Sequence, residues 1–354
     1  MLPPVADAGG PLVLRSTGVP YVWSASPIPY RTDNGPLSAT VNEMAARSRV
    51  LAMFNVWQNV ASSSISYTRQ GPISSTSGFS DGDVSTVAEY DAVEATCNNG
   101  SQSPIIYDAT GTIFTDLGYD VTSILGFAGP CAIDATNYLS GQAMMNGLFI
   151  DGQASPVPDI PDTAFDAVFV HEFGHFSGLD HSQINVNCQF GCSLDDLAGL
   201  PTMFPLLLHA SQGVLSIDDV AWISRLYPQL SGGSSFASTH GTISGTVFFS
   251  DGESHAQLVN VIARAVDTGA NQDRTTAASV VSGYRFRVIH GNPINDPGDT
   301  FGSQAPNLIG LYEIPVPPGN YMVEVESIDS SFTEGSSVGG PIQISMPGIA
   351  PAPL

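Results

Sequence analysis

No other segment limits the possible structures of this 354-residue chain as strongly as HEFGHFSGLDHS, residues 171–182. It holds three of the seven histidines, a glutamate directly after the first and a glycine three residues after the second. Helix residues four apart lie on one face, so His171 and His175 would reach one metal ion. Gly178 would let the chain leave the helix in a left-handed conformation and bring His181 back as a third ligand. The segment predicts a helix, a glycine turn and a metal site.

The types of side chain in this segment predict a catalytic site. Three neutral imidazoles leave one position of a zinc ion open, whereas structural zinc sites are closed by four protein ligands. Zinc lowers the pKa of a bound water toward 7 and polarises a carbonyl group. Glu172, about 100° around the helix from His171, would lie beside the ion as general base and then acid. A histidine-rich amphipathic helix and an inactive metal site are the alternatives; Glu172 argues against the second. We expect peptide-bond hydrolysis.

The composition excludes other classes of protein. The formal net charge is −23, from 33 acidic and ten basic residues, and all ten basic residues are arginines. This charge excludes binding to nucleic acid or an anionic membrane and indicates solubility in an external or salty medium, the alternative being attraction of a basic substrate. The sequence contains no apolar run of about 20 residues, so it predicts no membrane span. The start, MLPPVADAGG, lacks a signal-peptide pattern. We expect a secreted monomer whose signal was removed, or a trimmed chain.

The cysteines indicate an oxidising compartment. Four are present, Cys97, Cys131, Cys188 and Cys192, and none has zinc-finger spacing. Four cysteines allow three pairings. We favour Cys188–Cys192, which would close the small loop NCQFGCS, and Cys97–Cys131. Four reduced, buried thiols are the alternative.

The chain is long enough for two domains, and the Gly/Ser-rich stretch 231–241 places their boundary. We predict an α+β domain over residues 1–235 and an all-β domain over residues 236–354. Asp162 or Thr163 is the expected N-cap of the second helix, Asp166 lies in its first turn, and Gly178 is its C-cap; Ser216 caps the third helix and Pro228 ends it. Hydrophobic periodicity predicts helices over 40–60, 161–179 and 216–227, and strands over 64–69, 103–108, 123–129, 143–152, 241–252, 258–267, 282–289 and 310–328.

Three segments together resemble the matrixin branch of the metzincin zinc peptidases. HEFGHFSGLDH matches the HExxHxxGxxH motif, with Ser182 following as in matrixins. LPTMFP resembles the Met-turn, and LSIDDVAWISRLYP resembles the closing helix. The resemblance spans about residues 15–230. It implies a twisted mixed sheet, three main helices, one zinc in the cleft and a secreted zinc endopeptidase of EC 3.4.24 type. Met203 would be an apolar floor beneath the zinc.

The resemblance also implies where a protein or peptide substrate binds. Leu125, Gly126, Phe127 and Ala128 would form the edge strand along which an extended peptide lies; an ordinary interior strand is the alternative. Phe204, Pro205 and the residues up to His209 would line the S1′ pocket. Astacins and serralysins carry tyrosine where this chain has Pro205. A pappalysin-type metzincin, which also has disulfides near its site, is a weaker alternative.

Other features depart from the matrixin pattern. The remaining histidines, His209, His240, His255 and His290, do not form the segment that holds a structural zinc, so we expect a single zinc. Calcium is a second candidate ion, at Asp108 and Asp116 or at Asp81 and Asp83, with solvated loop acids as the alternative. No cysteine-switch segment is present, so a latency propeptide is absent or already removed.

Residues 236–354 resemble the small β-sandwiches of the carboxypeptidase regulatory-like family, an Ig- or prealbumin-like fold. The resemblance rests on ISGTVFFSDG and YEIPVPPGNYMVEVE, in which PPGNY would form a tight turn. This domain would be an accessory module for attachment, or a spacer. The rival function for the whole chain is a cell-surface adhesion protein with a relic zinc site.

Overall fold

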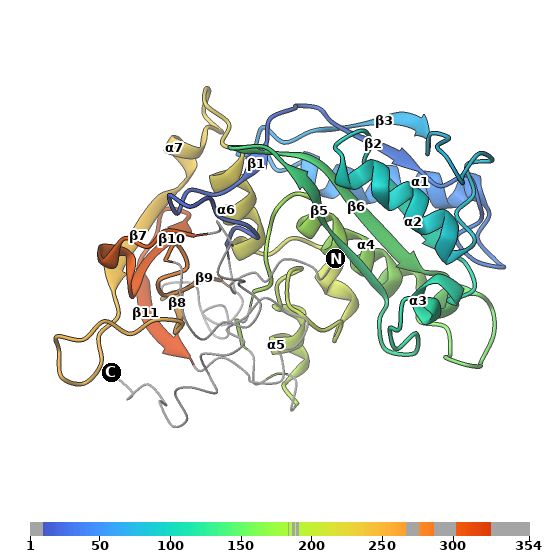
Figure 1. Cartoon of the computed structure of the whole chain (residues 1–354). Coiled ribbons are helices and arrows are strands. Elements are labelled where there is room, and N and C mark those ends of the chain that lie inside the picture. The colour runs from blue at the N-terminus through green and yellow to red at the C-terminus, as the bar shows by residue number, and fades with distance from the viewer. Residues whose placement is uncertain are drawn as a thin grey trace. The chain divides into compact units, whose positions relative to one another are not determined.

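The computed structural model describes residues 10–182, 184–185, 188, 191–266, 276–286 and 302–326 (Figure 1). The chain forms two compact units. The sheet unit contains Val22–Asn59 and Ile65–Ser177, and the C-terminal unit contains Met1–Tyr21, Val60–Ser64 and Gly178–Leu354. The stretch 231–241 lies inside the C-terminal unit, and the separate domain 236–354 stays a prediction.

The sheet unit is built on one six-stranded sheet in the order β1-β6-β4-β2-β3, with β5 paired to β6. All neighbours in that order pair in parallel, whereas β5 is antiparallel to β6. The strands are β1 (Val22–Trp23), β2 (Ile28–Thr32), β3 (Tyr67–Pro72), β4 (Pro104–Asp108), β5 (Gly126–Ile133) and β6 (Asn137–Asn146). Strand β4 is buried along its whole length, as expected of a strand with neighbours on both sides and cover on both faces.

Helices cover both faces of this sheet. Successive residues of a strand point to opposite faces, so neighbouring residues of β6 contact different helices. On β6, a side chain at Gly141 would meet Phe176 of α4, whereas the Gln142 amide donates to the Tyr90 hydroxyl of α2. Figure 1 draws α2 and α4 on opposite sides of β6. The helical elements are α1 (Glu43–Gln58), α2 (Val87–Asn98), α3 (Thr112–Asp116), the 3-10 turn η1 (Gly147–Ile150) and α4 (Asp162–Phe176).

The C-terminal unit combines short helices with two small antiparallel sheets. Strand β7 (Gly241–Thr246) pairs with β10 (Leu311–Val316), and β8 (Asn260–Ala265) lies between β9 (Ala277–Val281) and β11 (Tyr321–Glu326). Its helical elements are α5 (Leu194–Ala198), η3 (Ala210–Gly213), α6 (Ile217–Leu226), α7 (Phe236–Thr239) and η4 (Pro306–Leu308). The chain is therefore a mixed α and β protein with one mainly parallel sheet and small antiparallel sheets, as the sequence predicts.

Several predicted elements are confirmed with shifted ends. The three predicted helices correspond to α1, α4 and α6, and the Ser216 hydroxyl accepts from the Asp219 N–H as the predicted N-cap. Helix α4 starts differently from the prediction: Pro161 is its N-cap position, without a side-chain cap, and Asp162 is its first residue. Asp166 lies beyond the first turn and pairs with Arg49 at 2.9 Å. Asp162, one of the two expected N-caps, also pairs with Arg49 of α1, at 2.7 Å.

Three strand predictions need correction. Residues 147–150, predicted as strand, form η1, because the Asn146 side chain accepts the Leu148 N–H and turns the chain. The strand predicted over 282–289 is also wrong: residues 282–285 form a turn, and β9 ends just before them. Residues 287–289 lie outside the described part. The predicted range 310–328 contains two strands, β10 and β11, which lie on either side of PPGNY and belong to different sheets. Helix α2 was not predicted; a Thr86–Glu89 capping box begins it.

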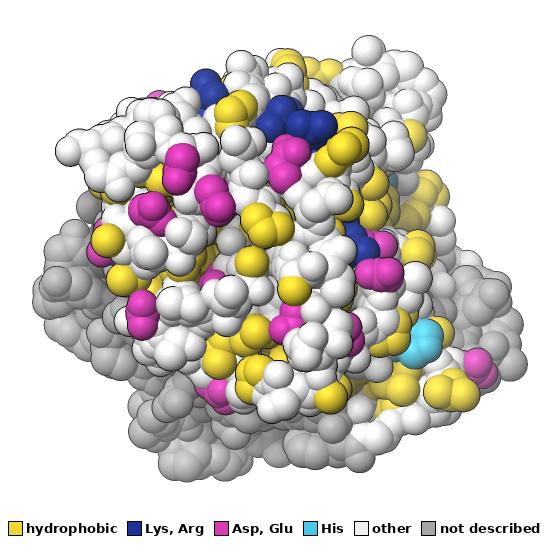
Figure 2. All heavy atoms as spheres, turned by 90° about the vertical axis from the view of Figure 1, so that its right-hand side faces the viewer, with side chains coloured by type: hydrophobic (Ala, Val, Ile, Leu, Met, Phe, Trp, Pro, Cys, Tyr) yellow, Lys and Arg dark blue, Asp and Glu magenta, His cyan; other side chains and the backbone are white. Residues whose placement is uncertain are grey.

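Both predicted disulfides are present. Cys97 of α2 bonds to Cys131 of β5, and Cys188 bonds to Cys192. Two disulfides in one chain are typical of proteins that fold in an oxidising compartment. In the described part, no helix is long and apolar enough to cross a membrane. On the face in Figure 2, acidic side chains are scattered among neutral and apolar ones, and arginines are few.

Candidate metal centre

Helix α4 is fixed by aromatic side chains on the side away from its histidines. Phe165, Phe169 and Phe173 recur every four residues, and their neighbouring ring centroids lie 5.6 and 5.7 Å apart. Phe173 also stacks on Phe54 of α1, with centroids 3.7 Å apart. All four rings are almost completely buried. Residue 173 is rotated about 200° from residue 171 on an α-helix, so this packing directs His171 away from the aromatic layer.

Two tryptophans hold the backbone at the end of α4. The Trp57 indole donates to the Val170 carbonyl at 2.8 Å, and the Trp23 indole donates to the Phe176 carbonyl at 2.8 Å. Both indoles are buried. Carbonyls in the last turn of a helix lack intrahelical partners, so the second bond satisfies one of them. These two bonds position the turns that carry His171 and His175, and no sequence pattern predicts them.

The three predicted histidines come together. The Nε2 atoms of His171 and His175 lie 3.1 Å apart, with the rings at 86° to one another. The potential ligand atoms of His171, His175 and His181 all lie within 4.8 Å of one another. Nitrogens bound to one tetrahedral zinc at 2.0–2.1 Å would lie about 3.4 Å apart. The donor set and its spacing fit such an ion, so these histidines form the candidate metal site.

Glu172, the predicted general base, is buried beside the first histidine. Only 6% of it is exposed, and its Oε2 atom has no hydrogen-bond partner in the described part of the chain. Burial raises the pKa of the Glu172 carboxyl to about 8. A buried carboxylate oxygen without a partner is unfavourable unless water or a cation faces it. This oxygen is a second observation that fits a metal site.

Strand β5 is an edge strand in the described part of the sheet. It pairs only with β6, and the predicted substrate-binding residues Gly126, Phe127 and Ala128 form its first three positions. Leu125 precedes the strand, and its carbonyl accepts from the Asn146 N–H at 2.9 Å. An edge strand leaves backbone N–H and carbonyl groups on one side able to pair with an added strand. Its eight residues are all half-buried.

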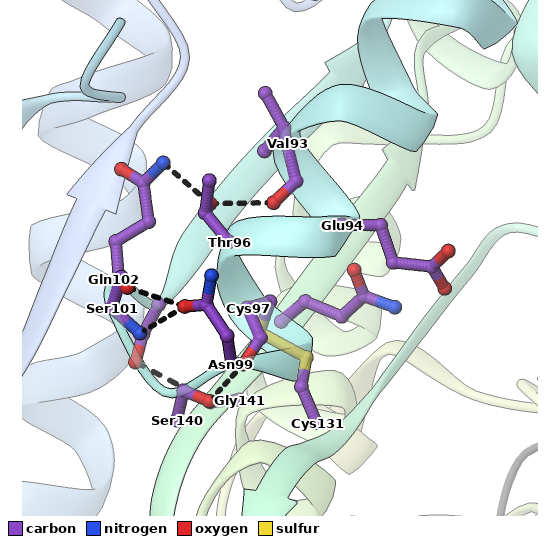
Figure 3. Close-up of a disulfide and its surroundings, with 12 residues drawn as sticks. Val93, Glu94, Thr96, Cys97, Asn99, Ser101, Gln102, Cys131, Ser140 and Gly141 are labelled. Atoms are coloured by element: carbon purple, nitrogen blue, oxygen red, sulfur yellow. Dashed lines mark hydrogen bonds between the residues drawn. A yellow bond between two sulfur atoms is a disulfide. The ribbon is translucent and has the colours of Figure 1, made fainter. Parts of the chain in front are cut away.

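The Cys97–Cys131 disulfide ties this edge strand to α2 (Figure 3). Around it, the Ser140 hydroxyl of β6 donates to the Cys97 carbonyl, and the Gln102 amide donates to the Thr96 hydroxyl at 2.7 Å. The disulfide and these bonds join α2, β5 and β6. They give the edge strand a covalent attachment that β6 alone does not provide.

Beyond α4 the chain turns at a left-handed glycine, as the sequence predicts, but the predicted C-cap is wrong by one residue, because the helix runs to Phe176 and Gly178 follows its C-cap. Ser177 is the C-cap, and Gly178 has a φ of +91°, a left-handed conformation that disfavours other residues. The Gly178 carbonyl then accepts from the Leu12 N–H at 2.8 Å, and the Gly10 carbonyl accepts from the Asp180 N–H at 3.0 Å. The glycine thus turns the chain so that residues 178–180 pair with residues 10–12, directly before His181.

The turn at Met203 is held by a buried aspartate of α6. Asp219 accepts from the backbone N–H of Thr202 at 2.9 Å and of Met203 at 3.1 Å, and it also caps its own helix. The Met203 carbonyl in turn accepts from the Ser182 N–H at 2.8 Å. Met203 is therefore buried. Its backbone is hydrogen-bonded to Ser182, the residue that follows His181. Its contact with a zinc ion stays a prediction.

The segment after Met203 divides into buried and open parts. Phe204 is buried in an apolar cluster with Cys188 and Leu200, against which Cys192 and Leu208 pack. Pro205 is half-buried and Leu206 is 38% exposed. Phe204 therefore supports the segment from inside. An S1′ pocket lined by Phe204 to His209 stays a prediction.

Two of the four acids considered for calcium, Asp108 and Asp81, accept backbone hydrogen bonds. Asp108 accepts from the Phe114 N–H at 2.8 Å, at the start of α3, and burial raises the pKa of its carboxyl. Asp81 accepts from the Asp83 N–H at 3.2 Å. In the described ranges, the three histidines are the only group of three or more His, Cys, Asp or Glu side chains close enough together to hold an ion. Calcium at Asp108 and Asp116, or at Asp81 and Asp83, stays a prediction.

No protein-family model matches the chain, and a comparison with curated proteins finds no match. Function is therefore inferred from the residues and their geometry.

Proposed function

We propose that this chain is a secreted zinc-dependent endopeptidase of the matrixin-like metzincin type. The observation that carries the proposal is the convergence of His171, His175 and His181 beside a buried carboxylate whose Oε2 atom lacks a partner in the described part. Three imidazoles and an adjacent glutamate are the groups that zinc-assisted hydrolysis requires. The two disulfides support secretion.

His171, His175 and His181 would hold the ion. Bound zinc supplies a Lewis acid, which polarises the scissile carbonyl and lowers the pKa of water. Glu172 takes a proton from the attacking water and later passes it to the leaving amine nitrogen. Its buried position suits this role, because burial raises the pKa of the carboxyl to about 8 and so brings it near neutral pH.

Strand β5 would align the substrate. An extended peptide adds to the open edge of β5 through main-chain hydrogen bonds, which bind without regard to sequence. A Cβ built on Gly126 would lie 3.2 Å from Glu172 Cγ, so this edge lies next to the proposed general base. The Cys97–Cys131 disulfide supports the same strand from α2. The protein or peptide substrate therefore binds as an added strand, and the side-chain pockets select among sequences.

The proposal is tested by zinc content and by Glu172→Gln. We expect one zinc per chain in the purified protein, cleavage of a denatured-protein peptide library, and loss of cleavage on chelation. Glu172→Gln should retain zinc and lower kcat by about 100-fold or more. Glu253→Gln, in an exposed turn, is the matched control and should cleave normally. Absence of zinc, or full activity in Glu172→Gln, would refute the proposal.

A further inference from the structure

We infer that strand β9 holds the segment that carries His181, through Asp218, and that Asp218 is a positioning residue for the third ligand. The inference rests on the proposed function, which makes His181 a ligand. Residues 277–281 lie in the region predicted to be an accessory module or a spacer. The inference gives these residues a role in the metal site itself.

Hydrogen bonds form a chain from β9 to the residue after His181. The Ser279 N–H donates to the Asp218 carboxylate at 2.7 Å. The Ser182 hydroxyl is also hydrogen-bonded to Asp218, and it lies 3.4 Å from the Ser279 hydroxyl. All three residues are buried. Removal of the Asp218 side chain would leave buried donors without their acceptor, which costs about 1–3 kcal/mol for each unsatisfied group.

A second set of contacts fixes β9 against α6, the helix that carries Asp218. The Trp222 indole donates to the Ser279 carbonyl at 2.8 Å, so both backbone polar groups of Ser279 bond to α6. Trp222 itself is 3% exposed. A Cβ added at Gly10 would lie 3.5 Å from the Trp222 ring and 3.6 Å from Val280. Helix α6 and strand β9 therefore pack as one body in the C-terminal unit.

The segment that carries His181 is enclosed by the same body. Ile184 forms a buried cluster with Ile262 of β8 and Ala277 of β9. On the other side of His181, Leu179 forms an isolated bridge with Pro11, and Asp180 bonds to Gly10. Residues 179–182 and 184 are thus held before His181 by the N-terminal segment and after it by β8, β9 and α6. A plain spacer would make none of the contacts with Ser182 and Ile184.

The test compares Asp218→Ala, Asp218→Asn and Trp222→Phe in the full chain, by zinc affinity and by amide hydrogen exchange. Asp218→Ala should weaken zinc binding about tenfold, the lower end of the effect of removing a supporting partner of a ligand. Asp218→Asn keeps an acceptor for Ser279 and should restore most of the affinity. Trp222→Phe keeps the apolar contacts and should show a smaller loss. The Ser182 amide, which donates to Met203, should exchange faster in Asp218→Ala.

Asp33→Ala is the matched control, because Asp33 is an equally buried aspartate that lies in the sheet unit. It should destabilise the chain and leave zinc affinity unchanged below the unfolding transition. Equal zinc affinity in Asp218→Ala and the parent chain, or an equal loss in Asp33→Ala, would overturn the inference. If the parent chain binds no zinc, the proposed function fails, while exchange at Ser182 still decides whether β9 holds this segment.

Discussion

Gly126 on the edge strand β5 lies directly against Glu172 on α4. A Cβ built on Gly126 would be 3.2 Å from Glu172 Cγ, 3.1 Å from the Met144 carbonyl oxygen and 3.3 Å from Met145 Cε. No larger residue fits there without a shift of one of these neighbours. The strand proposed to align a substrate and the proposed general base therefore touch, and the absence of a side chain at residue 126 sets their spacing.

Gly126→Ala should displace Glu172 or β5 by a few tenths of an ångström. We expect a stability loss of about 1–3 kcal/mol, as for other overpacked sites, and a lower kcat, because general-base geometry depends on short distances. Urea denaturation and peptide-cleavage kinetics measure the two effects. Gly233→Ala is the control, since a Cβ at Gly233 would meet nothing within 4 Å. Unchanged kcat in Gly126→Ala would show that this contact does not position Glu172.

The sequence predicts the grouping of the three histidines because most of what brings them together is local. His171, His175 and Gly178 lie within one helix and its end, where the periodicity of the helix and the left-handed glycine fix the geometry. The supports of α4 are long-range: Trp57 reaches Val170 across 113 positions and Trp23 reaches Phe176 across 153. No spacing rule links such residues. Asp218 and Asp219 likewise look like ordinary acids in a first helical turn.

Zinc should stabilise the chain through the three histidines. A ligand that binds only the folded state at 100 times its Kd adds about 2.7 kcal/mol to the free energy of unfolding. We expect Tm to rise on adding zinc to metal-free protein, and His175→Ala to abolish the rise. His255→Ala changes a histidine outside the group and should respond to zinc like the parent chain. An equal rise in both variants would place the bound zinc elsewhere.

The two disulfides should differ in their contribution to stability. Cys97 and Cys131 are 34 positions apart, whereas Cys188 and Cys192 are 4 apart. Loop-closure entropy gives about 4 kcal/mol for the longer loop and about 2 kcal/mol for the shorter. Cys97→Ala with Cys131→Ala should therefore lower the free energy of unfolding more than Cys188→Ala with Cys192→Ala. Denaturant titration of both double variants measures the order, and the reverse order would contradict it.

The strand errors have a different physical origin from the missed long-range contacts. The apolar run GLFI, residues 147–150, is completely buried, as a strand would be, but Asn146 turns its backbone into a 3-10 helix. Hydrophobicity reports burial and does not distinguish these two conformations in a short run. At residues 282–286, aromatic and polar residues alternate, which predicts a strand. The buried strand is instead the preceding AASVV of β9, which shows little alternation.

Loss of the proton from Asp33 should lower the free energy of unfolding as the pH rises. Asp33 is 0% exposed and accepts from the N–H groups of Gly35, Val84 and Tyr107. Burial, with the nearby charge of Asp83, raises the pKa of its carboxyl from 3.8 to about 7 against these bonds. Between these two values the folded chain keeps a proton that the unfolded chain releases. The stability from this proton is complete below about pH 4 and is lost by about pH 7.

One such proton gives a slope of about −1.4 kcal/mol per pH unit over that window. Asp33→Asn cannot titrate, so the free energy of unfolding of the parent chain minus that of the variant should fall between pH 4 and pH 7. Taking this difference cancels the other titrating groups. Denaturant unfolding at four pH values with saturating zinc measures it. For Asp120→Asn, at a fully exposed acid whose pKa is lowered by Thr122, the same difference should change little above pH 4. A constant difference for Asp33→Asn would mean that Asp33 is ionised in the folded chain throughout this range.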